Sequence, residues 1–510
     1  MLIRFLISKF SLSNYSEDFR RSFRNAIYST ADYLLLPILW FITTPIFISR
    51  LGMDQYGIWL LVNTFLGFSS VIGFGLSDAT IKYVSKYRAL GNKAAVIRVI
   101  RSTLTMYGIL GILVGISTFL AAPFLVYHIF NVKSENLEVA IIALRIGGLG
   151  IIIRFFDSVL QSAIYGYERY DLATRVTILT NTATMIINVV LVLNGYGLIE
   201  ILLVTVILLG VGGVAKMFIV KHVLIPNFVF TPLFDRFAFR EIFDFGFYSW
   251  LHSISGIFLH QVDRFLIASL LNMSALTYYV VCLQVAQQIH AVLSRAVSFL
   301  FPLSSAVKET GNLQRLRRIY FKGLNFTTIT AVAMGLPLFV FSHNVLSIWI
   351  GTMFANEAAN ILRILVLFFT LLATSIVPYY YLNGTGFVRL NALAGIIDGV
   401  IVVVVASFLI PQMGVAGASW AKLANVPIQI ILRTIIHYKV LADYRWFAAL
   451  GIFIPVIATF IIGFGVITIW GEPTLSFKLL IIMVLIYALL GASITGVLCY
   501  LFNYPKRILF

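Results

Sequence analysis

The chain has 510 residues, of which 60% are hydrophobic and 11% are charged. Soluble domains average roughly 45–50% apolar and about 25% charged residues, so this composition excludes an ordinary water-soluble protein. The formal charge is +17, but the basic residues lie in short loops between apolar stretches, which argues against nucleic acid as a partner. Cys282 and Cys499 each lie inside an apolar stretch, and they provide neither a disulfide framework nor a metal-binding spacing.

The first 24 residues precede any stretch long enough to cross a membrane. Met1–Phe10 is too short for the apolar part of a secretory signal, and Arg4 and Lys9 interrupt it. Two interpretations stay open for it, an amphipathic segment at the membrane interface and a disordered tail. We assign residues 1–24 to a cytoplasmic N-terminal segment.

Apolar stretches near the ~20 residues needed to cross a bilayer recur along the rest of the chain, and backbone in lipid must be helical to satisfy its own hydrogen bonds. We therefore predict an all-α, polytopic membrane protein with about 14 transmembrane helices. The predicted spans are residues 25–48, 56–78, 99–122, 137–162, 172–193, 198–220, 243–270, 274–302, 323–349, 357–382, 389–410, 415–436, 446–470 and 477–503.

The loops between these spans differ in charge from one side of the membrane to the other. With alternate loops assigned to alternate sides, 28 Lys and Arg lie on the side of the N-terminus, three lie on the opposite side and six fall in the interior of spans. Basic loops stay in the cytoplasm, so this bias places both termini there.

The first twelve spans form two sets of six. A shift of 220 residues places Gly91-Asn92 on Gly311-Asn312, and the basic loops around these residues also superpose. An even repeat keeps both halves in the same orientation, as in secondary transporters with a site between the halves. The predicted parts are an N-lobe (25–222), a cytoplasmic linker (223–242), a C-lobe (243–441) and two C-terminal helices (442–510).

No nucleotide-binding loop of the G-x-x-x-x-G-K-[ST] type occurs, and no loop is long enough for a catalytic domain. We therefore expect no cofactor and no ATP hydrolysis within this chain. The work would come from a proton or sodium gradient, or from a downhill substrate.

Polar residues at membrane depth are the candidate functional residues, because they usually face the bundle interior or a wet cavity. They concentrate in spans 1, 2, 7 and 8, which are equivalent in the two halves. The candidates are Asp32 in span 1, Asn63 in span 2, His252, His260, Asp263 and Arg264 in span 7, and Gln284, Gln288 and Arg295 in span 8. We predict that they line a central cavity whose two arginines hold an anionic group through paired hydrogen bonds. The alternative is that these side chains satisfy one another in a packed core.

Other charges inside spans have a structural interpretation. Arg154 and Asp157 are three residues apart on span 4 and are predicted to pair. Asp398, near the middle of span 11, is either an ion-coupling carboxylate or the partner of Lys422 in a buried ion pair. Asp32 is a second ion-coupling candidate.

Several short motifs resemble the polysaccharide-transport flippases of the multidrug/oligosaccharidyl-lipid/polysaccharide superfamily. In the first half these are Leu51-Gly52, Tyr56-Gly57-Ile58-Trp59 and Lys82-Tyr83-Val84. In the second half they are Gln261-Val262-Asp263-Arg264, Asn383-Gly384 and Gly414-Val415-Ala416-Gly417. The resemblance extends over essentially the whole chain.

The resemblance implies a bundle of six plus six helices, with two more at the C-terminus, that opens alternately to each side of a bacterial cytoplasmic membrane. Its cargo would be an undecaprenyl-pyrophosphate-linked repeat unit of O-antigen or another polysaccharide, with membrane lipids around it. A polysaccharide polymerase and a chain-length regulator are candidate protein partners. In the related lipid II flippase, spans 1, 2, 7 and 8 line a cationic cavity; here span 1 offers Asp32 and no basic residue within the membrane.

Two other functions compete with this one. An ion-coupled multidrug or cation exporter of the same superfamily should carry acidic residues in the first-lobe cavity, and Asp32 keeps that possibility open. A membrane polysaccharide polymerase or ligase would need a sizeable external loop with catalytic residues, which this chain lacks. We therefore expect a transporter and not an enzyme.

Overall fold

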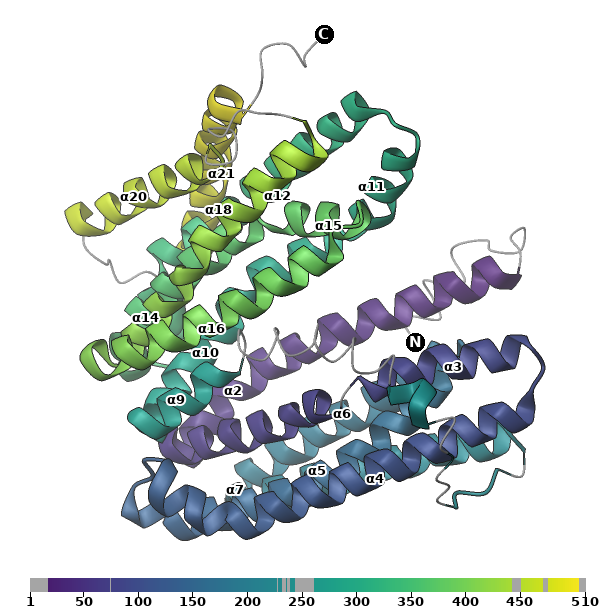
Figure 1. Cartoon of the computed structure of the whole chain (residues 1–510). Coiled ribbons are helices and arrows are strands. Elements are labelled where there is room, and N and C mark those ends of the chain that lie inside the picture. The colour runs from purple at the N-terminus through teal and green to yellow at the C-terminus, as the bar shows by residue number, and fades with distance from the viewer. Residues whose placement is uncertain are drawn as a thin grey trace. The chain divides into compact units, whose positions relative to one another are not determined.

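The structure is a computed structural model, shown in Figure 1. It describes residues 17–73, 75–226, 228–231, 235, 239–243, 261–442, 451–470 and 476–503, with the backbone alone at 17–34, 68–72, 470 and 501–503. The predicted interfacial segment therefore lies outside the described residues.

The described chain is helical, and 11 of its helices are long and apolar enough to cross a membrane. This confirms the prediction of an all-α, polytopic membrane protein. The main helices up to residue 224 are α2 (Glu17–Ile72), α3 (Leu76–Ala89), α4 (Lys93–Phe124), α5 (Leu137–Gly166), α6 (Tyr170–Leu193) and α7 (Leu198–Phe218). Short turns of π-helix at Leu125–Ile129 and Ile219–Leu224 extend α4 and α7.

The later helices are α9 (Val262–Leu270), α10 (Met273–Ala296), α11 (Leu300–Glu309), α12 (Leu313–Val340), α13 (Ser342–Trp349), α14 (Thr352–Ala373), α15 (Ile376–Gly384), α16 (Val388–Met413), α17 (Val415–Ala421), α18 (Val426–Ile435), α20 (Phe453–Trp470) and α21 (Phe477–Asn503). Contacts group the chain into two compact units, Met1–Ile254 and Ser255–Phe510. The finer division into lobes, linker and C-terminal pair stays a prediction.

In the first unit, α5 packs against both α4 and α7, and α6 packs against α2 and α7 (Figure 1). Glycines let α4 and α5 approach closely: a Cβ added at Gly115 would lie 2.6 Å from the Gly148 carbonyl oxygen, and one at Gly148 would lie 2.7 Å from that of Gly115. Small residues at crossings are the usual means of helix association in lipid. This crossing fixes α5, which carries Arg154 and Asp157.

Predicted spans 1 and 2 form one long helix, α2, because the predicted loop between them is helical. The backbone departs from helical geometry inside α2 only at Gly52, with φ of 79°, a left-handed conformation that glycine adopts without strain. In the second unit, residues 271 and 272 separate α9 from α10, and position 272 corresponds to Gly52 under the 220-residue shift. The predicted break is thus a kink in one half and an interruption in the other.

The second unit is built around α12, which packs against α10, α14, α20 and α21. Gly335 of α12 lies so close to α14 that a Cβ added there would collide with the Thr370 hydroxyl. Predicted spans 13 and 14, now α20 and α21, thus join the second unit through α12. Predicted span 7 is described at residue 243 and from residue 261 onward.

Two loops that correspond under the 220-residue shift share the same local geometry. Gly91 and Gly311 have φ of 68° and 65°. The next residues, Asn92 and Asn312, cap α4 and α12 by accepting hydrogen bonds from backbone N–H groups three residues on, at 3.0 and 2.9 Å. A left-handed glycine followed by an asparagine cap ends one helix and starts the next.

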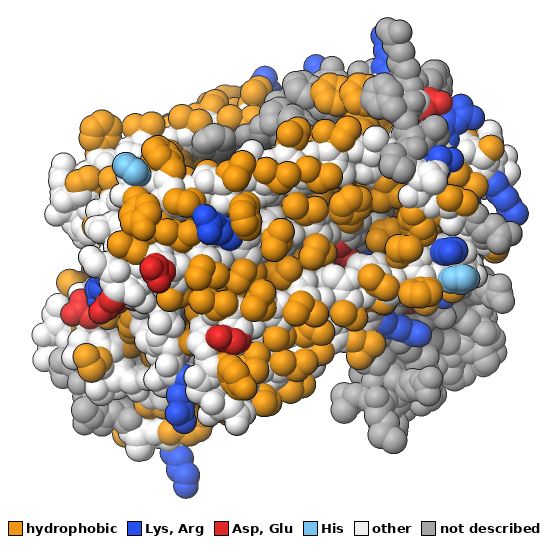
Figure 2. Space-filling view, turned by 90° about the horizontal axis from the view of Figure 1, so that it is seen from below, with side chains coloured by type: hydrophobic (Ala, Val, Ile, Leu, Met, Phe, Trp, Pro, Cys, Tyr) orange, Lys and Arg blue, Asp and Glu red, His pale blue; other side chains and the backbone are white. Residues whose placement is uncertain are grey.

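The surface is apolar where lipid would touch it. On α4, Ile109, Leu113, Ile116 and Leu120 recur at steps of three and four residues and are 47–70% exposed. Figure 2 shows a face on which hydrophobic side chains predominate and charged ones are scattered. Such a surface suits hydrocarbon and would be a liability in water.

Candidate functional site

The first unit contains a polar cavity of about 320 Å³ among α2, α5, α6 and α7. Its polar lining consists of Asn63, Arg154, Thr180, Asn181, Thr184, Asn188 and Thr205. None of the described residues that line it is acidic. The cavity therefore offers neutral amides and hydroxyls with a single positive charge.

Hydrogen bonds to backbone carbonyl oxygens fix the orientation of several of these side chains. The hydroxyls of Thr180, Thr184 and Thr205 donate to carbonyl oxygens four residues earlier, at 2.8–2.9 Å, as such residues commonly do inside helices. Asn188 Nδ2 donates to Thr205 Oγ1 at 3.0 Å, while the buried Asn188 Oδ1 has no hydrogen-bond partner. Because the hydroxyl protons are used locally, the lining leaves mainly acceptors for a ligand's own hydroxyl groups.

Asn63 is the predicted site residue that the structure places in this cavity. It lies in the second part of α2, beyond the Gly52 kink, and its Nδ2 donates to the Trp59 carbonyl oxygen at 2.8 Å. Asp32 belongs to the first part of α2, but its side chain lies outside the described residues, as do His252 and His260 entirely.

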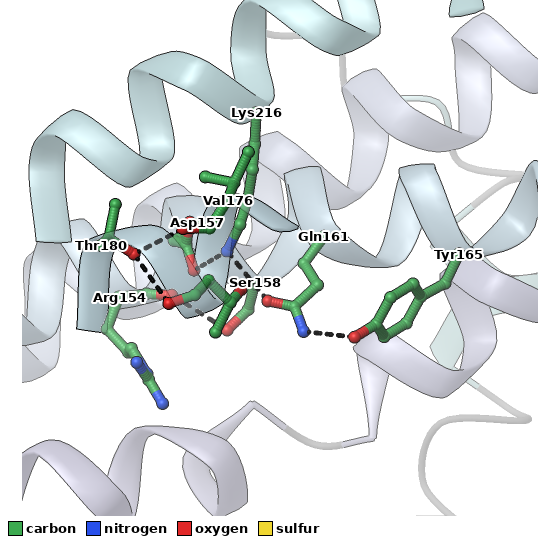
Figure 3. Close-up of polar contacts among 9 residues, drawn as sticks. Arg154, Asp157, Ser158, Gln161, Tyr165, Val176, Thr180 and Lys216 are labelled. Carbon is green, nitrogen blue, oxygen red and sulfur yellow. Dashed lines mark hydrogen bonds and ion pairs between the residues drawn. The ribbon is translucent and has the colours of Figure 1, made fainter. Parts of the chain in front are cut away.

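The predicted ion pair between Arg154 and Asp157 is wrong. Asp157 Oδ2 instead accepts from Lys216 Nζ of α7 at 2.8 Å, and the two side chains are 7% and 4% exposed. Lys216 also donates to Gln161 Oε1 at 2.9 Å, and the Gln161 amide donates to the Tyr165 hydroxyl at 2.9 Å. In Figure 3 the Arg154 guanidinium points away from this buried network. The ammonium group of Lys216 pairs with the Asp157 carboxylate because α5 and α7 pack directly against each other.

A second charged cluster lies in the other unit, where α9, α10, α16 and the 3₁₀ turn Lys422–Asn425 meet. Lys422 Nζ lies 2.7 Å from Asp263 Oδ2, and the Tyr279 hydroxyl donates to the same oxygen at 2.5 Å. All three residues are buried. Buried ions of this kind need a partner and further hydrogen bonds to offset their desolvation.

Asp398 of α16 belongs to the same cluster. Its Oδ2 accepts a hydrogen bond from Asn425 Nδ2, and its buried Oδ1 has no hydrogen-bond partner. Asp398 thus contacts the 3₁₀ turn that begins at Lys422, whereas the ion pair of Lys422 that the structure shows is with Asp263, which the sequence did not predict.

The remaining predicted residues do not converge on one point. Arg264 follows Asp263 in α9, and its backbone N–H donates to Asp263 Oδ1 at 2.9 Å. Arg295 lies in the last turn of α10, 16 residues after Tyr279, which is about 24 Å along the helix at ~1.5 Å per residue. The two arginines thus cannot hold one small anion together in this structure. Gln284 and Gln288 lie between, with Gln288 Nε2 donating to the Gln284 carbonyl oxygen at 3.2 Å.

Lys216 and the polar face of α6 were not predicted from the sequence. Asn181, Thr184 and Asn188 recur at steps of three and four residues in α6, the same signal that indicated spans 7 and 8. Lys216 lies near the end of a predicted span and was grouped with the cytoplasmic basic residues. No pattern in the sequence indicates that its side chain points to Asp157 on α5.

Comparisons with known proteins agree with this architecture. Residues 48–359 match the family described as "Polysaccharide biosynthesis protein". A relative from Shigella flexneri, named "Putative O-antigen transporter", is 21% identical over 439 residues, which is 83% of this chain and 99% of the relative.

Two solved structures share the fold. Lipid II flippase MurJ in an inward closed conformation superposes with a TM-score of 0.70 at 15% identity, covering 92% of this chain and 98% of MurJ. An inward-facing multidrug resistance MATE family transporter of the MOP superfamily superposes with a TM-score of 0.67 at 17% identity, covering 78% and 92%. At such identities these structures establish the fold alone, whereas the family match spans more than half of the chain. The chain is therefore a multi-pass membrane transporter that belongs to the polysaccharide biosynthesis protein family.

Proposed function

We propose that this protein is a flippase for undecaprenyl-pyrophosphate-linked oligosaccharide, an O-antigen unit or the repeat unit of another polysaccharide. It would move the head group from the inner to the outer leaflet of a bacterial cytoplasmic membrane, with both termini in the cytoplasm. The two lobes would open alternately, and the lipid tail would stay in the bilayer. A polysaccharide polymerase and a chain-length regulator are the proposed protein partners.

The observation that carries this proposal is the lining of the first-unit cavity. Sugars present hydroxyl groups, and amides and threonine oxygens are suitable partners for them. A pyrophosphate is anionic, and arginine is the side chain that binds phosphate with paired hydrogen bonds. An exporter of cationic drugs would instead need carboxylates at this place, and the described lining residues include none.

The decisive experiment is deletion of the gene followed by a leaflet-resolved assay of the lipid-linked oligosaccharide. We expect the intermediate to accumulate in the inner leaflet and transport to return with a plasmid-borne copy. Normal arrival of the intermediate in the outer leaflet of the deletion strain would refute the proposal.

Coupling to an ion gradient is a further part of the proposal. The ion pair with Asp263 occupies Lys422, so Asp398, whose carboxylate accepts a hydrogen bond from the neutral Asn425 amide, would need a proton or another cation to be neutral. Asp398 Oδ1 lacks a partner, and we assign uptake of a proton or sodium ion to it, with Asp32 as a second candidate. In proteoliposomes, an imposed pH or sodium gradient should accelerate flipping by the wild type but not by Asp398→Asn. Equal acceleration of both would refute this assignment.

Arg264 and Arg295 are proposed to contact the cargo separately. Arg264→Gln and Arg295→Gln should each reduce flipping at normal protein levels. Unchanged flipping in either variant would remove that arginine from the site.

A further inference from the structure

Arg154 lines the polar cavity of the first unit without an ion-pair partner among the described residues. We infer that the Arg154 cavity binds an anionic oxygen group that adjoins sugar hydroxyls, either a phosphate or a carboxylate, and that Lys216 keeps the site open by holding Asp157. This inference rests on the proposed function and names the part of the cargo that the first unit holds.

Arg154 faces a cavity that contains no acidic side chain among the described residues. Its side chain is exposed and lines the cavity, and Figure 3 shows its guanidinium directed away from Asp157 and Lys216. An arginine at membrane depth is costly to maintain and normally pairs with an anion or lines a wet cavity. Here the cavity supplies no carboxylate among the described residues, so the matching negative charge has to arrive with a ligand.

The ion pair between Asp157 and Lys216 leaves Arg154 able to bind a ligand. Asp157 lies three residues further along α5, a spacing at which side chains on a helix can pair. Its carboxylate is instead bound to Lys216 at 2.8 Å in a contact almost closed to solvent. Removing one partner of such a buried pair leaves an uncompensated charge, which is strongly unfavourable. Lys216 therefore prevents Asp157 from neutralising Arg154.

Asn188 and the volume of the cavity indicate the kind of ligand that fits beside Arg154. Asn188 is 1% exposed and lines the cavity, and its buried Oδ1 has no hydrogen-bond partner. It can accept a hydrogen bond from a sugar hydroxyl while Arg154 binds an adjacent anionic group. The volume of about 320 Å³ lies at the lower end of the ~300–1,000 Å³ typical of small-molecule sites. The cavity is thus suited to one sugar with its anionic group and not to a whole lipid-linked oligosaccharide.

Transport by single variants tests the role of Arg154. In the deletion strain, Arg154→Gln should reduce flipping at least about tenfold, the loss expected when a hydrogen bond to a charged group is removed. Arg145→Gln is the matched control, because Arg145 lies on the same helix and its guanidinium rests over the Phe119 ring outside the cavity. It should flip normally. Wild-type flipping by Arg154→Gln at normal membrane levels would overturn the inference.

A double substitution tests the role of Lys216. Lys216→Met should reduce flipping, because the freed Asp157 carboxylate captures Arg154. Asp157→Asn combined with Lys216→Met should restore flipping, because it removes that carboxylate and leaves Arg154 unpaired. Flipping is normalised to the amount of folded protein in the membrane, because a merely structural role of the pair would change that amount and leave the flipping per molecule unchanged. If Lys216→Met flips normally, or if the well-expressed double variant stays inactive, the gating role of Lys216 is refuted.

Binding to the purified full-length protein separates the two sources of the anion. Farnesyl pyrophosphate serves as a phosphate probe without sugar, and methyl glucuronide serves as a sugar carboxylate. A roughly tenfold or larger loss of affinity in Arg154→Gln for one of these probes identifies the group that Arg154 binds. Unchanged affinity for both would overturn the inference even if the wild type flips its cargo, whereas absence of flipping by the wild type would refute the proposed function.

Discussion

Replacing Lys422 by methionine should destabilise the second unit. The Lys422 and Asp263 side chains are 2% and 3% exposed, and their ion pair measures 2.7 Å. Without the ammonium group, the carboxylate of Asp263 keeps only the Tyr279 hydroxyl and the backbone N–H of Arg264. Breaking a buried pair from one side typically costs about 3–5 kcal/mol. At about 2–4 °C per kcal/mol for a domain of this size, the midpoint of thermal unfolding should fall by roughly 6–20 °C.

Intrinsic fluorescence of the purified protein in detergent reports this midpoint. Lys439→Met is the control, because Lys439 is exposed, and a surface substitution should change stability by no more than about 0.5 kcal/mol. Asp263→Asn in the Lys422→Met background should recover most of the loss, since it removes the uncompensated carboxylate. A Lys422→Met midpoint equal to that of Lys439→Met, or a double variant less stable than Lys422→Met, would refute the reasoning.

Three further predictions concern the scaffold. Gly115→Leu should abolish accumulation of folded protein in the membrane, because its side chain would enter the α5 backbone; Gly465→Ala, with open space around it, should accumulate normally. Gly91→Ala and Gly311→Ala should lower the thermal midpoint about equally, each costing about 1–2 kcal/mol for a left-handed backbone; markedly unequal losses would contradict the equivalence of the loops. Glu241→Gln should speed hydrogen exchange in α3 by the same factor at pH 6 and pH 8.

The pH independence of that last effect follows from two hydrogen bonds outside the spans. Glu241 accepts from Lys86 Nζ at 3.1 Å and from the Tyr87 hydroxyl at 2.7 Å. These hydrogen bonds raise the pKa of both Lys86 and Tyr87 above their usual values. A group whose pKa is raised by folding contributes fully to the free energy of unfolding at pH values below its ordinary pKa, which is near 10 for both groups. That contribution is lost only as the pH rises above the ordinary pKa. An exchange effect that differs between pH 6 and pH 8 would contradict this reasoning.

The helical content was predictable because apolar length and the hydrogen-bonding needs of backbone in lipid leave few alternatives. The break between spans 1 and 2 was predicted from a polar interval around Gly52. Polarity alone cannot distinguish a loop from a kinked helix, since one left-handed glycine lets the chain turn while most hydrogen bonds continue. The matched loops at Gly91 and Gly311 were visible because both capping residues are retained.

The site was harder to predict because charge pairing depends on helix packing. Spacing along one helix favoured an ion pair between Arg154 and Asp157. Only the packing of α5 against α7 shows that the Asp157 carboxylate pairs with Lys216. Likewise, depth counting brought Lys422 near Asp398, whereas the position of α9 determines its contact with Asp263. Asn63 was found because it belongs to a polar helix, while the polar face of α6 was overlooked among its many apolar neighbours.

The Asp157–Lys216 pair also has a consequence for biogenesis. Lys216 follows Asp157 by 59 residues, so ribosomes synthesise α5 well before its partner charge exists. During that interval Asp157 can pair with Arg154, three residues away on the same helix. The arrival of α7 then brings Lys216 to the carboxylate and leaves Arg154 to line the cavity. In a nascent chain truncated before residue 216, Arg154 should therefore still be paired with Asp157.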